Sequence, residues 1–271
     1  MTGRTGEIDS APPIALVTGA SSGIGYDLAR LLAADRHDLV LVARGAGRLA
    51  AISSELAAQH GIRALPLPAD LSDPASPETI ASALRERGLA VDILINNAGF
   101  GTYGPFACSD AARELAMLQV NIVSLVHLTR LFLPAMIERG RGRVLNVAST
   151  AAFQPGPLMS GYYASKAFVL HFSEALSNEV EGRGVTVTAL CPGPTRTNFQ
   201  IAAEIRASRL VRGSLMMDSG RVAREGYDAM LRGDPLVVTG FRNRMLSRAV
   251  RFLPRRLVTR MVRRFQDRAA T

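Results

Sequence analysis

The sequence predicts one α/β domain built on a doubly wound parallel sheet of about seven strands, followed by a basic helical tail. Short apolar runs alternate with helical patterns of ten or more residues, which is typical of a parallel sheet with helical crossovers. A glycine-rich turn follows the first apolar run. At 271 residues and 48% hydrophobic composition, the chain is large enough for one sizeable core.

The first strand is predicted at Ile14–Thr18, with the glycine-rich turn at 19–25 and a helix running on through Leu32. Glycine permits a tight turn and close approach of a pyrophosphate, and a helix N-terminus attracts an anion. A glycine triplet alone also occurs in plain turns, but a strand before it and a helix after it favour a Rossmann-like dinucleotide site. The residues expected at this turn are Gly19, Ser21, Ser22, Gly23, Ile24 and Gly25.

The second strand is predicted at Asp38–Ala43, and Arg44 follows it directly. In dinucleotide-binding folds the residue at this position faces the adenosine ribose. An acid there binds the 2′-hydroxyl of NAD, whereas an arginine accommodates a 2′-phosphate. Arg44 therefore predicts NADP(H) in preference to NAD(H). Arg48 is either a second phosphate ligand or a solvated residue that opens the next helix.

The remaining elements alternate regularly. We expect strands at 63–67, 91–95, 143–148, 185–190 and 235–239, and helices at 48–60, 74–87, 111–138, 161–181 and 218–231. Polar or glycine-containing segments follow the carboxyl ends of the strands, namely Asp70, Asn97, Ser149 and Pro192-Gly193. Ligands of such sheets bind at the carboxyl ends of the strands, so these residues are predicted to share one site.

Tyr162 and Lys166 lie four residues apart on the helix predicted at 161–181, which places them on one face. Of the 32 Lys and Arg residues only Lys166 is a lysine, and the other 31 are arginines. A nearby ammonium lowers the pKa of a phenol, so the pair suits proton exchange with a carbonyl or an alcohol. Alternatively, the lysine is a chance residue on a solvated face. Spacing alone leaves Tyr163 as a second candidate.

Asn121 falls inside the helix predicted at 111–138. Asparagine is a poor residue for a helix interior, so it requires an explanation. The simplest one is a surface position.

These motifs together resemble the short-chain dehydrogenase/reductase family over about residues 14–240. The resemblance rests on Thr18-Gly19-x-x-x-Gly23-x-Gly25, Asp70, Asn96-Asn97-Ala98-Gly99, Asn121, Ser149, Tyr162-x-x-x-Lys166 and Pro192-Gly193. It selects Tyr162 over Tyr163. It also implies further cofactor contacts from Leu71, Ala98, Gly99, Thr195 and Thr197, beside Tyr162 and Lys166 themselves.

The resemblance implies a role for each of four catalytic residues. Tyr162 is the general acid in reduction and the base in oxidation, and Ser149 hydrogen-bonds the substrate oxygen. Lys166 binds the nicotinamide ribose and lowers the pKa of Tyr162. Asn121 holds a water that links Lys166 to solvent. The expected activity is therefore oxidoreduction of a carbonyl or secondary alcohol with NADP(H). A regulator or scaffold that binds NADP(H) on the same fold is the alternative.

The substrate is expected to be a lipophilic ketone or aldehyde, because the segments that set specificity carry few charges and many apolar residues. These are Phe100, Tyr103, Phe106, Phe153, Leu158, Met159, Phe199, Leu215, Met216 and Met217. Alternatively, these residues only pack a lid over the site. A sugar epimerase or dehydratase is disfavoured, because little chain remains for a substrate domain.

The basic character of the chain belongs to its tail. Residues 241–271 contain ten Arg and one acid, a net charge of +9, which equals the charge of the whole chain. Apolar residues recur there at helical spacing, and Pro254 divides them into two amphipathic helices. Such helices suit an anionic membrane surface, here through 242–268, or docking on the domain or a subunit. Nucleic acid is disfavoured because no binding motif is present.

The division we expect is a flexible N-terminus at 1–13, a dinucleotide-binding catalytic domain at 14–240 and the tail at 241–271. Cys108 and Cys191 provide no disulfide framework, and the four histidines lack ligand spacing, so no metal site is expected. No signal-like apolar run opens the sequence, which suggests a cytoplasmic protein, peripheral to a membrane at most. The family resemblance implies a homodimer or homotetramer.

Overall fold

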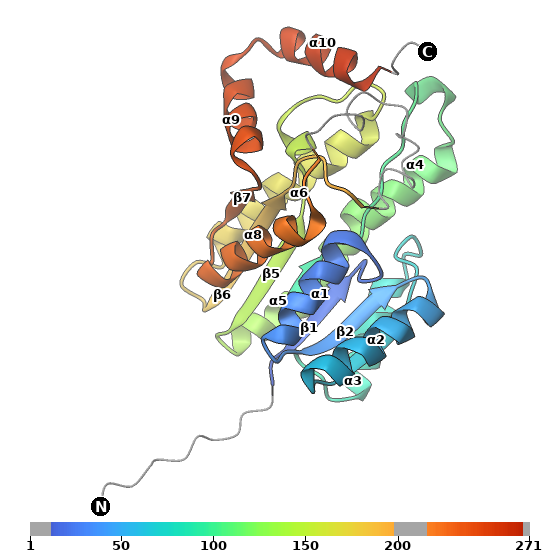
Figure 1. The fold of residues 1–271 in the computed structure, drawn as a ribbon, viewed down its shortest axis with the longest axis vertical. Helices are drawn as coiled ribbons and strands as arrows, with labels where there is room; N and C mark the ends of the chain where they lie inside the picture. Colours follow the sequence, from blue (N-terminus) through green and yellow to red (C-terminus); the bar gives the residue numbers. More distant parts are fainter. Residues whose placement is uncertain (1–11, 198–215, 268–271) are drawn as a thin grey trace, which may run out of the picture.

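A computed structural model describes residues 12–197 and 216–267, and its centre is a parallel sheet of seven strands (Figure 1). The strand order is β3-β2-β1-β4-β5-β6-β7. The strands are β1 Ile14–Thr18, β2 Asp38–Ala43, β3 Ala64–Pro68, β4 Val91–Asn96, β5 Gly142–Val147, β6 Val185–Cys191 and β7 Leu236–Val238. The predicted seven-stranded doubly wound sheet is confirmed, with each strand within about two residues of its expected bounds.

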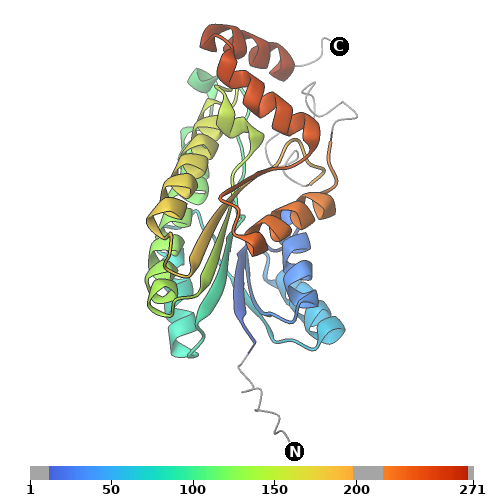
Figure 2. The same cartoon turned by 90° about the vertical axis from the view of Figure 1, so that its left-hand side faces the viewer.

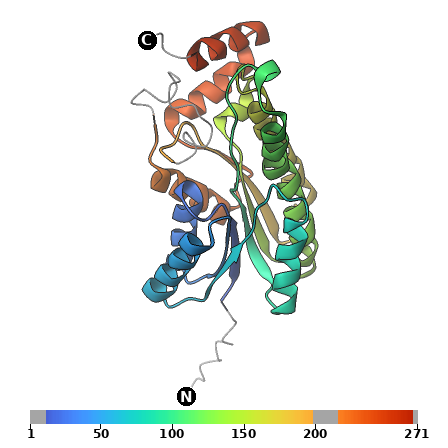
Figure 3. The same cartoon turned by 90° about the vertical axis from the view of Figure 1, so that its right-hand side faces the viewer.

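Helices cover both faces of the sheet (Figures 2 and 3). One face carries α1 Gly23–Ala34, α2 Ala46–His60 and α8 Ser219–Arg232. The other carries α3 Ser76–Glu86, α4 Ala111–Leu118, α5 Leu125–Glu138 and α6 Ser160–Glu179. Three short 3₁₀ turns lie in the connections, η1 Phe106–Cys108, η3 Thr150–Phe153 and η4 Val250–Phe252.

Strand β1 shows why the strands are almost continuously apolar. Val17 packs into the cluster beneath α1, α2 and α8, whereas Leu16 packs into the cluster beneath α3 and α5. Successive side chains of a strand point to opposite faces, so a sheet that is covered on both sides needs apolar residues at every position. The order of the strands reverses beside β1, and the cleft opens at the carboxyl ends there.

The helix predicted at 111–138 is interrupted. A π-helical segment, η2 Gln119–Ser124, lies between α4 and α5 and contains Asn121. By length and hydropathy alone, Ala111–Glu138 could cross a membrane, with a mean hydropathy of 1.6 over its best window. In this structure Leu128 and Met136 of the same stretch are buried in the core of the domain.

The tail forms the two predicted helices. Helix α9 spans Phe241–Ala249, and α10 spans Arg255–Gln266 and begins directly after Pro254. Both lie across the end of the molecule at which the strands terminate (Figures 1 and 2). Val258 and Val262 of α10 belong to a buried cluster that also contains Met159, Tyr162 and Tyr163, so this helix docks on the domain.

Candidate active site

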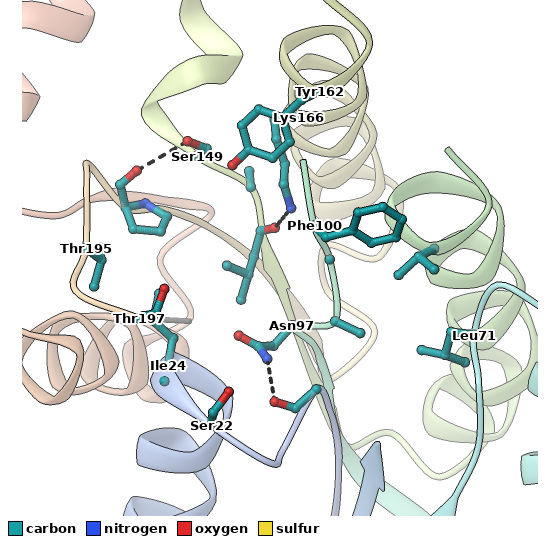
Figure 4. A pocket seen from close by; sticks show the side chains of 18 of the residues that line it. Ser22, Ile24, Leu71, Asn97, Phe100, Ser149, Tyr162, Lys166, Thr195 and Thr197 are labelled. Carbon is teal, nitrogen blue, oxygen red and sulfur yellow. Dashed lines mark hydrogen bonds between the residues drawn. The ribbon is translucent and has the colours of Figure 1, made fainter. Parts of the chain in front are cut away.

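A cleft of about 530 Å³ opens at the carboxyl edge of the sheet. Residues that follow β1, β2, β3, β4, β5 and β6 all line it, as do side chains of α6 (Figure 4). The predicted site residues that line the cleft are Gly19, Ser21, Ser22, Gly23, Ile24, Arg44, Asp70, Leu71, Asn97, Ala98, Gly99, Ser149, Tyr162, Lys166, Pro192, Gly193, Thr195 and Thr197. Two predicted residues, Gly25 and Asn121, lie behind its wall.

The glycine-rich turn runs tightly against the loop after β4. Gly19 and Gly23 have φ values of +65° and +57°, which favour glycine. A Cβ atom at Gly25 would lie 2.3 Å from Asn97 Nδ2 and 2.4 Å from the Gly19 oxygen. Gly25 therefore allows α1 to approach the turn, and it is not among the residues that line the cleft. Its predicted part in cofactor binding stays a prediction.

Thr18 connects the glycine-rich turn to the loop after β4, a role that was not predicted from the sequence. Its buried hydroxyl accepts hydrogen bonds from the backbone N–H groups of Asn97 and Ala98, each at 3.0 Å. The Asn97 amide donates in return to the Thr18 carbonyl oxygen at 2.9 Å. A hydroxyl at the end of an otherwise apolar strand was the available signal for this role.

The N-terminus of α1 fits an anionic group. Among the described residues, no side chain caps the first turn and no acid lies within it. The Ser22 and Gly23 positions that open this helix line the cleft. Free N–H groups and the positive end of the helix dipole therefore face the cleft, as a pyrophosphate requires.

Arg44 lies at the cleft end formed by β2 and β3. Its side chain is exposed and lines the cleft beside Asp70. Hydrogen bonds from the Ser72 backbone N–H at 3.0 Å and the Ser72 hydroxyl at 2.8 Å, aided by the Arg44 charge, lower the pKa of Asp70. Arg48 does not line the cleft, and its Nε donates to the Ser21 carbonyl oxygen at 2.6 Å. Arg48 thus braces the glycine turn.

Ser149, Tyr162 and Lys166 meet at the opposite end of the cleft (Figure 4). Ser149 follows β5, and its hydroxyl forms a hydrogen bond with the Tyr162 hydroxyl. The Ser149 oxygen also accepts from the Ala151 N–H at 3.1 Å, which orients it. One turn along α6, Lys166 Nζ donates to the Val147 carbonyl oxygen at 2.8 Å.

Burial controls the acidity of this group. It raises the pKa of Tyr162 well above its usual value, and the hydrogen bond from Ser149 offsets only part of that effect. Burial lowers the pKa of Lys166 to about 8. The net shift of the Tyr162 pKa in this structure is upward, because desolvation disfavours the phenolate. The expected lowering of this pKa by the Lys166 ammonium stays a prediction.

Asn121 is buried, so the surface explanation for it is wrong. Its Oδ1 accepts from the Phe100 N–H at 3.1 Å. Its Nδ2 donates to the Phe100 carbonyl oxygen and to the Ser165 hydroxyl, both at 3.0 Å. A Cβ at Gly99 would lie 2.9 Å from Asn121 Oδ1 and 3.3 Å from Lys166 Nζ. Gly99 therefore lies between Asn121, which does not line the cleft, and Lys166, which does.

Tyr163 lies beside Tyr162, edge-on, with ring centroids 6.0 Å apart. It lines the cleft, and its ring fills the space where a Cβ at Gly156 would stand, 2.2 Å from Cγ. It shares a buried cluster with Val258 and Val262 of α10, whereas the Ser149 hydroxyl bonds to Tyr162. The contacts therefore distinguish Tyr162 from Tyr163, which their spacing from Lys166 could not do.

The substrate end of the cleft is mostly apolar. It is lined by Phe100, Ala116, Val120, Ala151, Met159 and Tyr163, with Thr150 and Gln154 as polar members. Of the apolar residues singled out in the sequence, Phe100 and Met159 are in this lining, whereas Phe106 is solvent-exposed and outside it. Phe199 and Leu215 lie outside the described residues. Ala116, Val120 and Gln154 were not predicted, because nothing local in the sequence distinguishes them.

Comparison with known proteins identifies the family. A family model described as short chain dehydrogenase matches residues 13–207. A curated relative, the ketoacyl reductase HetN of Nostoc sp., is 34% identical over 196 residues, which cover 72% of this chain and 68% of the relative.

Solved structures agree with this match. A short-chain dehydrogenase from Sphingobium yanoikuyae in complex with NADPH is 33% identical, with a TM-score of 0.80, and the match covers 89% of this chain and 94% of that one. A short-chain dehydrogenase/reductase from Burkholderia phymatum in complex with NAD is 26% identical, with a TM-score of 0.78 and the same coverage. The chain therefore belongs to the short chain dehydrogenase family, whose members are oxidoreductases that interconvert carbonyls and alcohols with a nicotinamide cofactor.

Proposed function

We propose that this protein reduces a lipophilic ketone or aldehyde with NADPH, with Tyr162 as the general acid. The observation that carries the proposal is that one cleft has the glycine turn at one end and the Ser149–Tyr162–Lys166 group at the other. A nicotinamide dinucleotide laid along this cleft would bring its reactive ring to the end where the hydroxyl groups converge.

Residues that line the cleft would hold each part of the cofactor. The glycine turn and the α1 N-terminus would bind the pyrophosphate, and Asp70 and Leu71 would face the adenine. Arg44 would pair with a 2′-phosphate, for which a planar guanidinium is well suited. Thr195 and Thr197, on the loop after β6, would contact the nicotinamide half. When bound, the nicotinamide supplies the hydride.

The side chains around Tyr162 have complementary tasks in this proposal. Its raised pKa keeps Tyr162 protonated at neutral pH, so it can donate a proton to the carbonyl oxygen as negative charge develops. Ser149 donates a second hydrogen bond to that oxygen. Lys166 contributes positive charge and binds the ribose, while Asn121 supports the relay of protons to solvent.

The preference for a lipophilic substrate rests on the lining of the substrate end. There the apolar side chains outnumber the two polar ones, and Lys166 is the charged residue among the described lining residues at that end. The name of the relative HetN, a ketoacyl reductase, is consistent with a carbonyl on an apolar chain. A regulatory role on the same fold is not favoured, because the relatives are reductases and dehydrogenases.

The test is an NADPH-oxidation assay against a panel of ketones and aldehydes, with Tyr162→Phe and Tyr163→Phe beside the wild type. We expect Tyr162→Phe to lose activity by at least about a hundredfold, as for loss of a general acid. Tyr163→Phe should keep turnover, since the Ser149 hydroxyl bonds to Tyr162. Equal losses in the two variants, or faster reduction of small polar ketones than of fatty and steroidal ones, would refute the assignment.

We also propose a cytoplasmic homo-oligomer. Exposed Leu115, Val123 and Phe168 lie on α4, η2 and α6, which is a set of apolar side chains that a partner subunit would cover. Among the described residues both cysteines are free thiols, as in a reducing compartment. Light scattering would measure the mass, and a monomer at micromolar concentration would contradict this assembly.

A further inference from the structure

Helix α10 has an apolar face that is wider than its contact with the domain. Five apolar residues lie within about 140° of arc at about 100° per residue, namely Leu257, Val258, Met261, Val262 and Phe265. Only one side of this arc is covered. Docking on the domain therefore does not account for the whole apolar face.

The covered side consists of Val258, Val262 and Gln266, spaced four residues apart. The two valines pack against Met159 and Tyr163 at the substrate end of the cleft. The Tyr103 hydroxyl donates to the Gln266 carbonyl oxygen at 2.6 Å, which secures the last turn of the helix. These contacts fix the rotation of α10 about its axis and hence which residues face outward.

The uncovered side is a second stripe with the same spacing, formed by Leu257, Met261 and Phe265. Phe265 is 60% exposed, and Phe252, in the turn before α10, is 87% exposed. Exposed Phe241 and Met245 add an apolar stripe on α9. Large apolar side chains grouped in this way on a surface mark an interaction site.

Arginines border this stripe. At about 100° per residue, Arg256, Arg260, Arg263 and Arg264 lie on the arc next to it, opposite the docked side. Residues 241–267 contain nine Arg and one acid, Asp267, and within the described part of the chain Asp267 pairs with Arg263. A second copy would bring the same positive charge to the contact, which disfavours self-association. Phosphate groups fit arginine forks.

We propose that α9 and α10 bind an anionic membrane surface, with the Leu257–Met261–Phe265 stripe and Phe252 entering the headgroup region and the bordering arginines meeting lipid phosphates. The other side of α10 shares a buried cluster with Met159 and Tyr163, which line the substrate end of the cleft. Membrane binding through α10 would therefore bring that end close to the lipid (Figure 1). A lipophilic substrate would then reach the cleft from the bilayer. The binding itself does not depend on the proposed reaction.

Vesicle flotation with the full-length protein tests the proposal. We compare phosphatidylcholine vesicles with and without phosphatidylglycerol, at low and high salt. The wild type should bind the anionic vesicles, and salt should weaken binding. Arg260→Gln/Arg264→Gln should lower the partition coefficient by about tenfold or more, at roughly 1 kcal/mol per arginine near an anionic surface. Leu257→Ser/Met261→Ser/Phe265→Ser should lower it at least as much.

Matched controls remove the same groups elsewhere on the surface. Arg183→Gln/Arg224→Gln and Leu231→Ser alter exposed residues away from the tail, and they should bind like the wild type. Circular dichroism and turnover of a water-soluble ketone would show that the tail variants remain folded and active. Wild-type protein that fails to bind anionic vesicles, or tail variants that bind unchanged, would overturn the proposal. The proposal would also be overturned if Leu257→Ser/Met261→Ser/Phe265→Ser changed the oligomeric mass but not vesicle binding.

Discussion

The ammonium of Lys166 donates a 2.8 Å hydrogen bond to the carbonyl oxygen of Val147, at the last residue of β5. This bond anchors α6 to the end of the strand that leads to Ser149. The only lysine of the chain is therefore a buried charge with a backbone partner, and its position is set by the sheet as well as by its spacing from Tyr162.

Burial of Lys166 predicts a pH dependence of stability. Its pKa is about 8 in the folded protein and about 10.5 when unfolded, so between these values the unfolded state binds more protons. The contribution of Lys166 to the free energy of unfolding should therefore rise with pH through this window, by about 2 kcal/mol between pH 7 and pH 9.5.

The measurement is urea unfolding of the wild type and Lys166→Met at both pH values. Tyr162 and Cys191 have raised pKa values in the folded state, so their contribution to the free energy of unfolding falls as the pH rises. This contribution is present in both proteins. The difference between the two proteins therefore reports Lys166. If the difference in free energy between the two proteins does not change with pH, Lys166 does not have the lowered pKa.

Arg44 should control the choice of cofactor. We expect Arg44→Asp to lower kcat/KM for NADPH by about tenfold to a hundredfold, the loss of charge-assisted hydrogen bonds to a phosphate. The value for NADH should stay the same or rise, because an acid in this position suits the ribose 2′-hydroxyl. Initial rates with each cofactor at one fixed substrate concentration measure both effects.

Arg48 provides the contrast for that experiment. Its Nε bonds to the Ser21 carbonyl oxygen in the glycine turn and not to the cleft, so Arg48→Met should weaken NADPH and NADH alike. If Arg48→Met lost NADPH binding selectively while Arg44→Asp bound NADPH like the wild type, the roles of the two arginines would be the reverse of those we assign.

Gly25 should tolerate no side chain. Gly25→Ala places a Cβ within 2.4 Å of the Asn97 amide and the Gly19 oxygen, so either the turn or the start of α1 must move. We expect a loss of stability of about 1–3 kcal/mol together with weaker cofactor binding. Gly47→Ala, on an open face of α2 with nothing within 4 Å, should instead be neutral or stabilise by about 0.5–1 kcal/mol. Thermal melts and NADPH titration distinguish the two.

Asn121 should be important for folding as well as for any relay. Asn121→Ala leaves the Phe100 N–H, the Phe100 carbonyl and the Ser165 hydroxyl without this partner, at a cost of about 2–4 kcal/mol. Ser165→Ala removes one of these bonds and should cost about 1 kcal/mol. Chemical denaturation measures both, and similar values for the two variants would argue against the Phe100 bonds.

Local chemistry and periodicity were enough to predict the sheet. Apolar runs bounded by turn residues located all seven strands, and the glycine turn and Arg44 followed from their places after β1 and β2. The sequence also predicted that one edge of the sheet carries Asp70, Asn97 and Ser149, because the strands of a parallel sheet end on the same side. These features depend on residues close together in the chain.

Contacts between distant residues were decided only by the tertiary structure. The amide of Asn121 reaches Phe100 and Ser165 through a π-helical turn that no local pattern announced. The Lys166 ammonium bonds to Val147, a residue 19 positions away in the chain. The burial that raises the pKa of Tyr162 also comes from the packing of distant segments.

The tail shows the same division. The sequence determined two amphipathic helices with arginine-rich sides, whereas docking on Tyr163 and Met159 decided which stripe of α10 is buried and which is exposed. The physical reason is that helical periodicity depends only on neighbours along the chain. Burial and pKa depend on which surfaces the fold brings together.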